Sequence, residues 1–185
     1  MATQLLTYPQ SVRLWRTLGL VFGGAALITL GAKVQIPFWP VPMTLHTLAV
    51  FLVAAALGPR LGMAAMGSYL MAGAMGLPVF SGTPERGIGL AYMVGPTGGY
   101  LLGYLMSAGV VGWLARGRGW IGQTGAMLAG LATVYVAGLV WLSVFVPTTG
   151  LLAVGFTPLI MGDLVKIVIA GLLLAGLRQM KAARQ

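Results

Sequence analysis

Residues 151–177 read LLAVGFTPLIMGDLVKIVIAGLLLAGL, an apolar run whose only charged side chains are Asp163 and Lys166. An α-helix needs about 20 apolar residues to cross a hydrocarbon core that is about 30 Å thick. The run is long enough, so we expect it to span a membrane. Charged side chains are costly at membrane depth and usually mark function. This segment therefore indicates both the class of fold and a candidate site.

The composition of the whole chain supports a membrane protein. Of its 185 residues, 58% are apolar and 7% are charged, whereas a soluble domain carries about 25% charged residues. Glycine is abundant, as is common where membrane helices pack closely. The net charge is +9, and the basic residues lie between the apolar runs and at the termini, which argues against a nucleic-acid-binding protein. The sequence has no cysteine, which excludes disulfides and thiolate chemistry.

Hydropathy divides the chain into six spans. We expect transmembrane helices at residues 17–35, 43–58, 61–80, 92–114, 120–146 and 151–177. The predicted fold class is an all-α membrane protein, a six-transmembrane-helix bundle that forms a single integral domain over residues 1–185. Arg13 and Arg16 precede the first run as in a signal peptide, but the run is too long, and we interpret it as a first membrane helix.

The positive-inside rule predicts the orientation of these spans. If the N-terminus is cytoplasmic, the cytoplasmic segments hold basic residues and no acidic residue. These basic residues are Arg13, Arg16, Arg60, Arg116, Arg118, Arg178, Lys181 and Arg184. The external segments then hold Lys33, Glu85 and Arg86. We therefore expect both the N- and C-termini to be cytoplasmic, in a multi-pass protein of the lipid bilayer.

Small residues recur at four-residue spacing, which lets helix backbones approach closely. The pairs are Gly19 and Gly23, Gly95 and Gly99, Gly99 and Gly103, Ala126 and Gly130, and Gly171 and Ala175. We interpret most of them as packing contacts within one bundle. Contact with a partner membrane protein is the sharper hypothesis, and it is favoured most for the first span.

Asp163 and Lys166 are three residues apart and therefore lie on one face of a helix. We expect them in the outer half of the membrane. A buried ion pair often fails to recover its desolvation cost. A pair that merely neutralises itself therefore explains these residues less well than a site for a polar substrate that arrives from outside.

The segment before the second span is a second candidate. Phe38 and Trp39 lie among Pro37, Pro40 and Pro42, which fix a stiff extended path. The two aromatic residues are either anchors of an interfacial belt or a rigid apolar wall over a pocket, whose stiffness would lower the entropy cost of binding.

Weaker candidates lie at helix starts and inside the second span. Thr97 and Gly98 belong to the stretch GPTGGY at 95–100, where free amides at a helix start favour anionic or carbonyl groups, although ordinary helix starts look similar. One histidine, His46, makes no metal site, and a hydrogen-bonded interior histidine is the default expectation. Other residues at membrane depth are expected mostly to be packing residues or interface anchors: Thr44, Thr47, Tyr69, Tyr92, Tyr135 and Trp141.

No set of residues indicates an enzyme. Ser68 and Ser107 are far in sequence from His46, and no motif joins them. The sequence also lacks a phosphate-binding loop of the GxxxxGK[ST] type, so the chain itself is not expected to hydrolyse ATP. We predict no catalytic residues, no metal and no cofactor.

Four stretches, taken together, resemble the BioY family, the biotin-specific substrate-binding (S) components of energy-coupling-factor (ECF) vitamin transporters. They are PFWPVPMT at 37–44, LPVF at 77–80, GPTGGY at 95–100 and GDLVK at 162–166. The resemblance implies a six-helix fold, capture of biotin from outside, and a prokaryotic plasma (inner) membrane. It also implies a transmembrane coupling protein and two cytoplasmic ATP-binding subunits, although some members of the family look able to transport biotin alone.

The resemblance also implies a set of substrate-binding residues. They are Asp163, Lys166, Thr97, Gly98, Phe38, Trp39, Tyr92 and His46. Asp163 would suit the ureido N–H groups of biotin and Lys166 its carboxylate, unless the two act together on one end of the ligand. The chain departs from the family at His46, where glutamine is common.

Three other functions compete with this interpretation. A secondary transporter or channel for another small solute would use Asp163 as a proton or cation site. An intramembrane hydrolase would need a nucleophile and base that the sequence does not offer. A purely structural subunit would leave Asp163 and Lys166 without a purpose.

Overall fold

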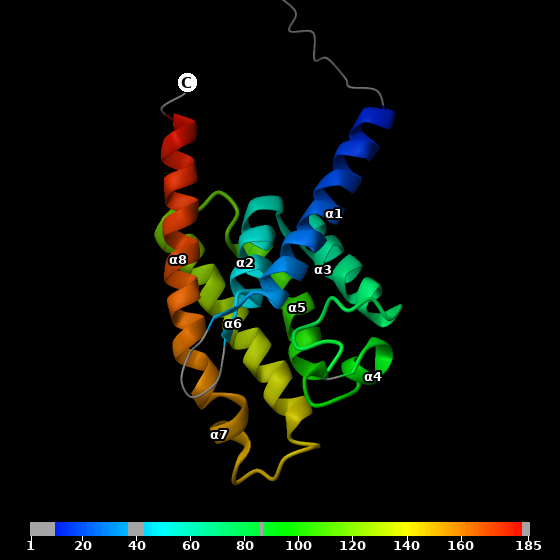
Figure 1. Ribbon diagram of the computed structural model, residues 1–185. Coiled ribbons are helices and arrows are strands. Elements are labelled where there is room, and N and C mark those ends of the chain that lie inside the picture. Colours follow the sequence, from blue (N-terminus) through cyan, green and yellow to red (C-terminus); the bar gives the residue numbers. More distant parts are fainter. Residues whose placement is uncertain (1–9, 37–42, 86, 183–185) are drawn as a thin grey trace, which may run out of the picture.

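The computed structural model describes residues 10–36, 43–85 and 87–182, and this part of the chain is mostly helical (Figure 1). The helices are α1 (Gln10–Lys33), α2 (His46–Leu57), α3 (Pro59–Ala74), α4 (Gly89–Met93), α5 (Gly98–Leu114), α6 (Trp120–Leu142), α7 (Leu151–Gly155) and α8 (Thr157–Ala182). Two short strands, β1 (Gln35–Ile36) and β2 (Met43–Thr44), pair antiparallel.

Several of these helices have the length and composition of membrane spans. Among the described residues, three helical segments are long and apolar enough to cross a membrane: Ser11–Lys33, Trp120–Leu142 and Leu151–Gly176. Helices α2 and α5 are also apolar but shorter. The expectation of a helical membrane protein is confirmed at this level, and the number of six spans stays a prediction.

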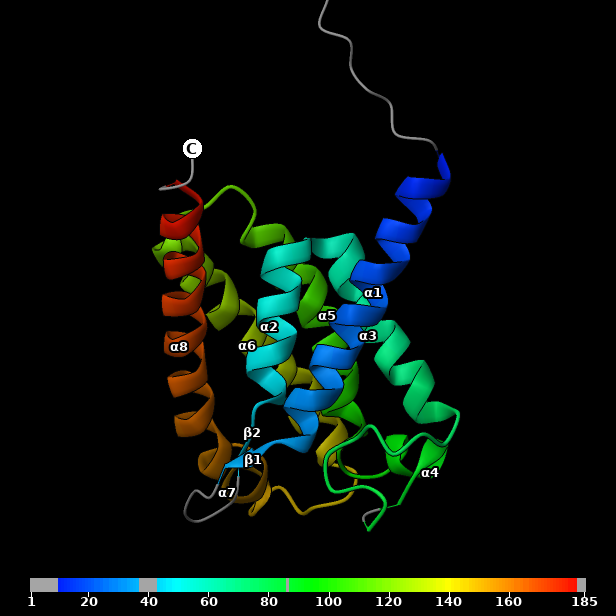
Figure 2. The ribbon, with the colours of Figure 1, turned by 45° about the horizontal axis from the view of Figure 1, so that its top comes forward.

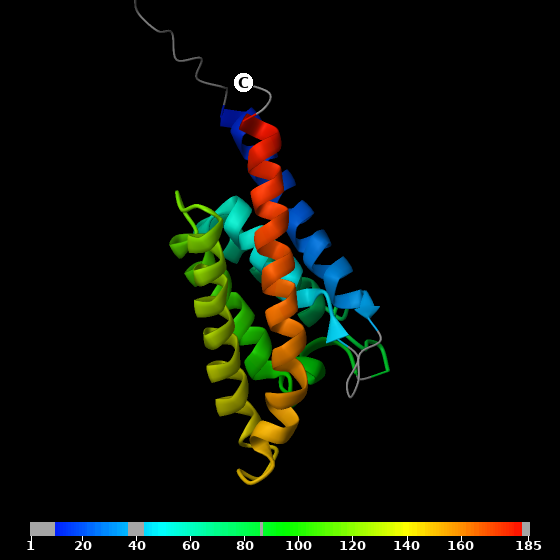
Figure 3. The same ribbon diagram turned by 90° about the vertical axis from the view of Figure 1, so that its left-hand side faces the viewer.

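The long helices surround a shared interior. Helix α5 packs along α6 and also against α2 and α3, while α1 covers α2 and α3. Helix α8 closes the bundle against α2 and α6, and Figure 3 shows it running beside α6. The start of α1 and the end of α8 lie at the same end of the bundle (Figures 1 and 2). This arrangement agrees with an even number of crossings.

The start of the second predicted span differs from the expectation. Residues 43 and 44 form strand β2 and the helix begins only at His46. Gln35 pairs with Thr44 and Ile36 with Met43, and the Leu45 amide donates to the Val34 carbonyl. The backbone groups here are satisfied by a strand pair and not by a helix, so the all-α description needs this small correction.

Two other predicted spans are interrupted. The helix expected at 92–114 is broken between Met93 and Gly98, because Pro96 has no N–H to donate and disfavours helical geometry in the residue before it. The run 151–177 breaks at Phe156, and Pro158 then lies in the first turn of α8, where a proline is tolerated.

The remaining span boundaries shift without changing the architecture. The first helix begins at Gln10, before the predicted residue 17, and the fifth ends at Leu142, before residue 146. The third helix ends at Ala74 and not at residue 80. Gly76 follows with a φ of 90°, a left-handed geometry that favours glycine and ends the helix.

Close packing of α5 on α6 depends on a missing side chain. A Cβ added to Gly103 would lie 2.8 Å from the Val134 Cα, so only glycine lets the two backbones come this close. The predicted packing role is therefore confirmed for Gly103. Gly19 and Gly23 on α1 differ, because a Cβ on either would meet nothing within 4 Å.

Replacing Gly103 with alanine should destabilise the bundle, because the neighbouring atom is backbone and cannot rotate away. Overpacking of this kind costs about 1–3 kcal/mol, which lowers the melting temperature by about 2–4 °C for each kcal/mol in a chain of this size. Thermal denaturation of the detergent-purified protein measures the effect. Gly125→Ala in α6 is the matched control, since its Cβ would face open space. Equal melting temperatures for the two variants would contradict the packing argument.

Candidate functional site

A cavity of about 390 Å³ lies inside the bundle. Segments distant in sequence contribute to its wall, from strand β2 to helix α8. The lining residues are Met43, Thr44, Thr47, Ser81, Tyr92, Pro96, Thr97, Tyr100, Tyr104, Val134, Tyr135, Leu142, Val154, Gly155, Leu159, Asp163 and Lys166. The wall combines apolar side chains with several hydroxyl groups and one pair of opposite charges, so the cavity suits a small amphipathic solute.

The Asp163 carboxylate is the centre of the polar part of this wall. Lys166 Nζ donates to its Oδ1 at 2.7 Å, and Thr47 Oγ1 donates to the same oxygen at 2.9 Å. The Tyr135 hydroxyl donates to Oδ2 at 2.7 Å. Three donors from α2, α6 and α8 thus fix one carboxylate, and charge-assisted bonds of this kind are the strong ones.

A second layer supports this carboxylate. The Tyr104 hydroxyl lies 2.6 Å from Thr47 Oγ1. The single proton of the Thr47 hydroxyl already goes to Asp163, so Tyr104 is the donor in this bond. The chain of bonds therefore runs from Tyr104 through Thr47 to Asp163, and it ties α5 and α2 to α8.

The ion pair is almost fully shielded from solvent. The side chains of Lys166 and Asp163 are only 7% and 8% exposed. Such a pair is costly to bury unless further hydrogen bonds satisfy it. Thr47 and Tyr135 supply those bonds for the carboxylate. The ammonium of Lys166 has three N–H groups, of which one is used by Asp163, so this part of the cavity combines a fixed acceptor with a cationic donor.

The loop between α3 and α4 covers one side of the cavity. The Tyr92 hydroxyl donates to the Ser81 carbonyl at 2.9 Å, and the ring of Tyr92 stacks on Phe80 with centroids 4.8 Å apart. Lys33 Nζ, at the end of α1, donates to both the carbonyl and the hydroxyl of Thr83 at 2.8 Å. These contacts hold the loop against α4 through Tyr92 and against the end of α1 through Lys33.

The structure brings four of the predicted site residues together. Asp163, Lys166, Tyr92 and Thr97 all line the cavity. Gly98 is the first residue of α5, directly after Thr97, and is not part of the lining. Phe38 and Trp39 lie outside the described residues, so their role as a wall stays a prediction.

His46 occupies a second layer and not the cavity wall. Its ring lies 4.5 Å from that of Tyr104 and 5.2 Å from that of Tyr69. Its Nε2 is buried and has no hydrogen-bond partner among the described residues. The rings of Tyr69 and Tyr104 pack against the imidazole, and the expected hydrogen bond of His46 stays a prediction.

Sequence reasoning missed the residues that position Asp163. Thr47 and Tyr135 belong to a group of six residues that were expected mostly to pack or to anchor, and these two bond the carboxylate. Tyr104 was not singled out at all. A usable signal existed in α5, where Tyr100 and Tyr104 are four residues apart and share one helix face.

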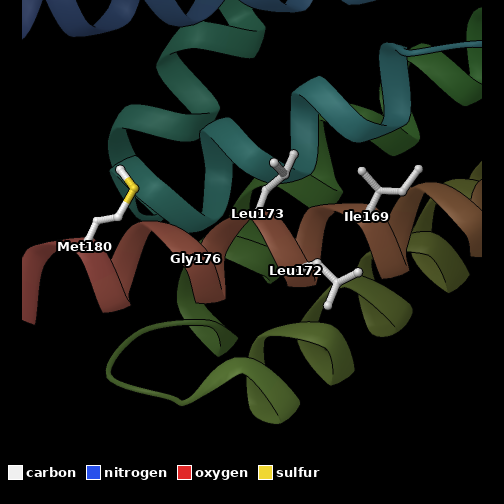
Figure 4. A pocket seen from close by; sticks show the side chains of 5 residues that line it. All are labelled: Ile169, Leu172, Leu173, Gly176 and Met180. Carbon is white, nitrogen blue, oxygen red and sulfur yellow. The ribbon is translucent and has the colours of Figure 1, made fainter.

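Other hollows in the described part of the chain lack this chemistry. One of about 370 Å³ runs along α8 and is lined by Ile169, Leu172, Leu173, Gly176 and Met180 (Figure 4). No polar side chain lines it, so it suits lipid chains and not a polar solute. The described residues also contain no group of three or more His, Cys, Asp or Glu side chains that could hold a metal ion.

The fold and this cavity define a helical membrane protein with an internal, mixed polar and apolar site. The chain belongs to the BioY family, whose sequence profile matches residues 3–183. A relative from Thermotoga maritima, the "Biotin transporter BioY", is 40% identical over 163 residues, which cover 86% of this chain and 94% of the relative. The "Biotin transporter BioY2" of Lactococcus lactis subsp. cremoris is 35% identical over 164 residues, covering 86% of this chain and 88% of that protein.

A solved structure agrees with this assignment. The S-component for biotin from an ECF-type ABC transporter, a crystal structure, superposes with a TM-score of 0.75 at 28% sequence identity. The superposition covers 93% of this chain and 95% of the other. The family resemblance found in the sequence motifs is therefore confirmed.

Proposed function

We propose that this protein is a transporter and not an enzyme: it binds biotin from the external side of the prokaryotic plasma membrane and delivers it inward as the S component of an ECF-type ABC transporter. Membership of the BioY family and the functions of the similar proteins support this proposal. The observation that carries it is the shielded Asp163–Lys166 pair in the wall of a cavity of about 390 Å³. A polar ligand gives a buried pair of charges a purpose that packing alone does not.

The chemistry of biotin matches the polar part of the cavity. Its ureido ring presents N–H donors beside a carbonyl acceptor. Asp163 Oδ2 accepts one bond from Tyr135 and retains a further lone pair, while Lys166 retains N–H donors. Because the two side chains are only 2.7 Å apart, the geometry favours joint action on the ureido ring over a division between the two ends of the ligand.

The remainder of the ligand is assigned to the less polar wall. Apolar lining residues such as Val134 and Leu159, with the ring of Tyr92, suit the thioether ring and the aliphatic chain. Thr97 offers a hydroxyl beside the start of α5 for the carboxylate or the ring of biotin. Phe38 and Trp39 are proposed as the apolar wall that closes the site.

We place the ligand site in the outer half of a six-span bundle with both termini cytoplasmic. The six spans are α1, α2, α3, α4 with α5, α6, and α7 with α8. Asp163 lies in the second turn of α8, far from the end of that helix, which lies at the same end of the bundle as the start of α1. If the termini are cytoplasmic, Asp163 lies nearer the external side, which supports access of the ligand from outside.

The outer face of α1 is proposed as the contact with a transmembrane coupling protein, itself joined to two cytoplasmic ATP-binding subunits. Gly19 and Gly23 have open space beside them, and they border an apolar groove of about 450 Å³ between α1, α2 and α8, which Leu20 and Leu27 also line. Gly23→Leu should therefore abolish ATP-dependent uptake in cells that contain the coupling proteins, while biotin binding to the purified protein stays within about twofold. Normal uptake by this variant would remove α1 from the coupling contact.

Binding of radiolabelled biotin to the detergent-purified protein tests the proposed function most directly. Saturable binding that unlabelled biotin displaces is expected. The alternative, a secondary transporter that uses Asp163 as a proton or cation site, predicts uptake that collapses with an uncoupler and is indifferent to ATP-binding partners. No saturable binding of biotin would refute the proposal.

Tyr135→Phe tests whether the bond to Asp163 positions the carboxylate for the ligand. The change keeps the ring and removes one hydrogen bond to a charged group, worth about 1.5–3 kcal/mol. We expect biotin affinity to fall about tenfold, as measured by calorimetric titration. In a double-mutant cycle, the same change should have little further effect in an Asp163→Asn background. Additive losses would show that Tyr135 acts independently of Asp163.

A further inference from the structure

A second cavity lies at the opposite end of the bundle from the ligand site. It measures about 540 Å³ and is lined by Leu57, Pro59, Arg60, Leu61 and Arg116. The turn between α2 and α3 and the loop between α5 and α6, which supply these residues, lie at the end of the bundle where α8 ends (Figure 2). No part of the proposed biotin site reaches it.

The two arginines are brought together by close backbone packing. A Cβ added to Gly112 in α5 would lie 2.5 Å from the Pro59 nitrogen and 2.7 Å from the Gly58 carbonyl carbon. The α2–α3 turn therefore sits directly on α5. Arg60 follows this turn and Arg116 lies four residues after Gly112, and both residues line the same cavity.

Neither arginine has an acidic partner among the residues that the structure describes. The whole sequence contains two acidic residues, Asp163 and Glu85. Asp163 is paired with Lys166, and Glu85 lies in the loop beyond the far end of α3, a helix of 16 residues that is about 24 Å long. Two cations bordering one cavity repel each other, and an anion between them would remove that repulsion.

The backbone adds to the positive potential. Helix α3 begins at Pro59, has no side-chain cap, and directs the amides of its first turn toward this end of the bundle. The N-terminus of a helix favours negative charge, and phosphate groups in particular. Guanidinium groups match phosphate oxygens through paired N–H donors. The chemistry of the cavity is thus that of a phosphate site.

The surroundings select a lipid as the source of that phosphate. Leu57 and Leu61 make part of the lining apolar. Trp113 and Trp120, at the two ends of the same α5–α6 connection, are 70% and 56% exposed. Exposed tryptophans mark the level of lipid headgroups, and basic pockets between helices at the cytoplasmic boundary bind anionic headgroups.

We propose that the Arg60–Arg116 cavity binds the phosphodiester headgroup of an anionic phospholipid of the cytoplasmic leaflet. The phosphate lies between the two guanidinium groups, and an acyl chain follows the apolar side of the cavity toward the membrane. The assignment to this leaflet rests on the proposed topology. Biotin recognition does not depend on the cavity, so the two proposals fail separately.

Lipid titration of the purified full chain, followed by native mass spectrometry, tests this site. Phosphatidylglycerol should bind more tightly than phosphatidylcholine. Losing a hydrogen bond to a charged group weakens binding about tenfold, so Arg60→Gln with Arg116→Gln, which removes both guanidinium contacts to the phosphate, should lower phosphatidylglycerol affinity about 100-fold. Biotin affinity should not change. Arg13→Gln with Arg16→Gln, which removes two cations from α1, is the matched control and should stay within about twofold.

Three outcomes would overturn the proposal. Equal phosphatidylglycerol affinity for the wild type and the Arg60/Arg116 variant would show that the cavity is not the site. Glycerol phosphate that binds as tightly as the lipid would identify a soluble phosphate as the ligand. Loss of ATP-dependent uptake with unchanged lipid binding would assign the cavity to a protein partner. If the glutamine variant does not fold, Arg60→Lys with Arg116→Lys keeps the charge and should retain lipid binding within about fivefold.

Discussion

Asp163→Asn is expected to lower biotin affinity more than about 100-fold and to abolish biotin uptake, while the protein still reaches the membrane. The substitution keeps the shape of the side chain and removes its charge. Lys166 then becomes a buried cation without its partner, which costs about 3–5 kcal/mol, and the amide offers only one acceptor oxygen to Thr47, Tyr135 and the ligand. Radiolabelled biotin binding to purified protein, together with uptake into cells, measures the effect.

Two further variants separate recognition from folding and from general charge effects. Glu85→Gln removes the only other acidic side chain of the sequence, which is exposed in the α3–α4 loop, and should leave biotin affinity unchanged. Asp163→Asn with Lys166→Gln removes both buried charges, and should restore thermal stability without restoring binding. If Asp163→Asn binds biotin as the wild type does, the carboxylate is not part of the site.

Lys166→Ala should have the second largest effect, again a loss of more than about 100-fold in biotin affinity. It removes the one cationic side chain among the described residues that line the cavity, and it leaves the Asp163 carboxylate as an unpaired buried anion. Lys181→Ala is the matched control on the same helix, because it lies 15 residues farther along, about 22 Å by helical rise. Isothermal titration with biotin compares the two variants.

Ligand analogues show which end of biotin Lys166 contacts. Joint action with Asp163 on the ureido ring predicts that Lys166→Ala weakens biotin and biotin methyl ester by similar factors. Contact with the valerate carboxylate predicts instead that the ester is already weak in the wild type and that the variant weakens it little further. Wild-type affinity of Lys166→Ala for biotin would remove the lysine from the site altogether.

The general architecture could be predicted from the sequence because membrane spans depend on local composition. A run such as 120–142 is long and predominantly apolar, and whether it forms a membrane helix does not depend on distant residues. The breaks were harder to foresee. Phe156 interrupts the last run two residues before Pro158, which has no N–H to continue the helix, but a proline alone does not fix where a membrane run breaks. The strand pair before α2 likewise depends on backbone partners that come from another segment.

The candidate site was likewise only partly predictable from the sequence. Asp163 and Lys166 could be found from the sequence, because a charge inside an apolar run is conspicuous. Thr47 and Tyr135 could not, since hydroxyl-bearing side chains are common in membrane helices and their role depends on which of them face the carboxylate. That information exists only once α2, α6 and α8 are packed around one cavity. His46 lies beside Tyr104 and Tyr69 and not among the described lining residues, so its role in binding stays a prediction.

The two hydrogen bonds from Lys33 to Thr83 bear on the rate at which a ligand could enter the cavity. They fasten the α3–α4 loop to the end of α1, and the same loop carries Ser81 in the cavity wall. A ligand that entered between α1 and this loop would have to break both hydrogen bonds first. On that route the two bonds would set how fast the ligand enters and leaves, whereas its affinity would still depend on Asp163 and Lys166.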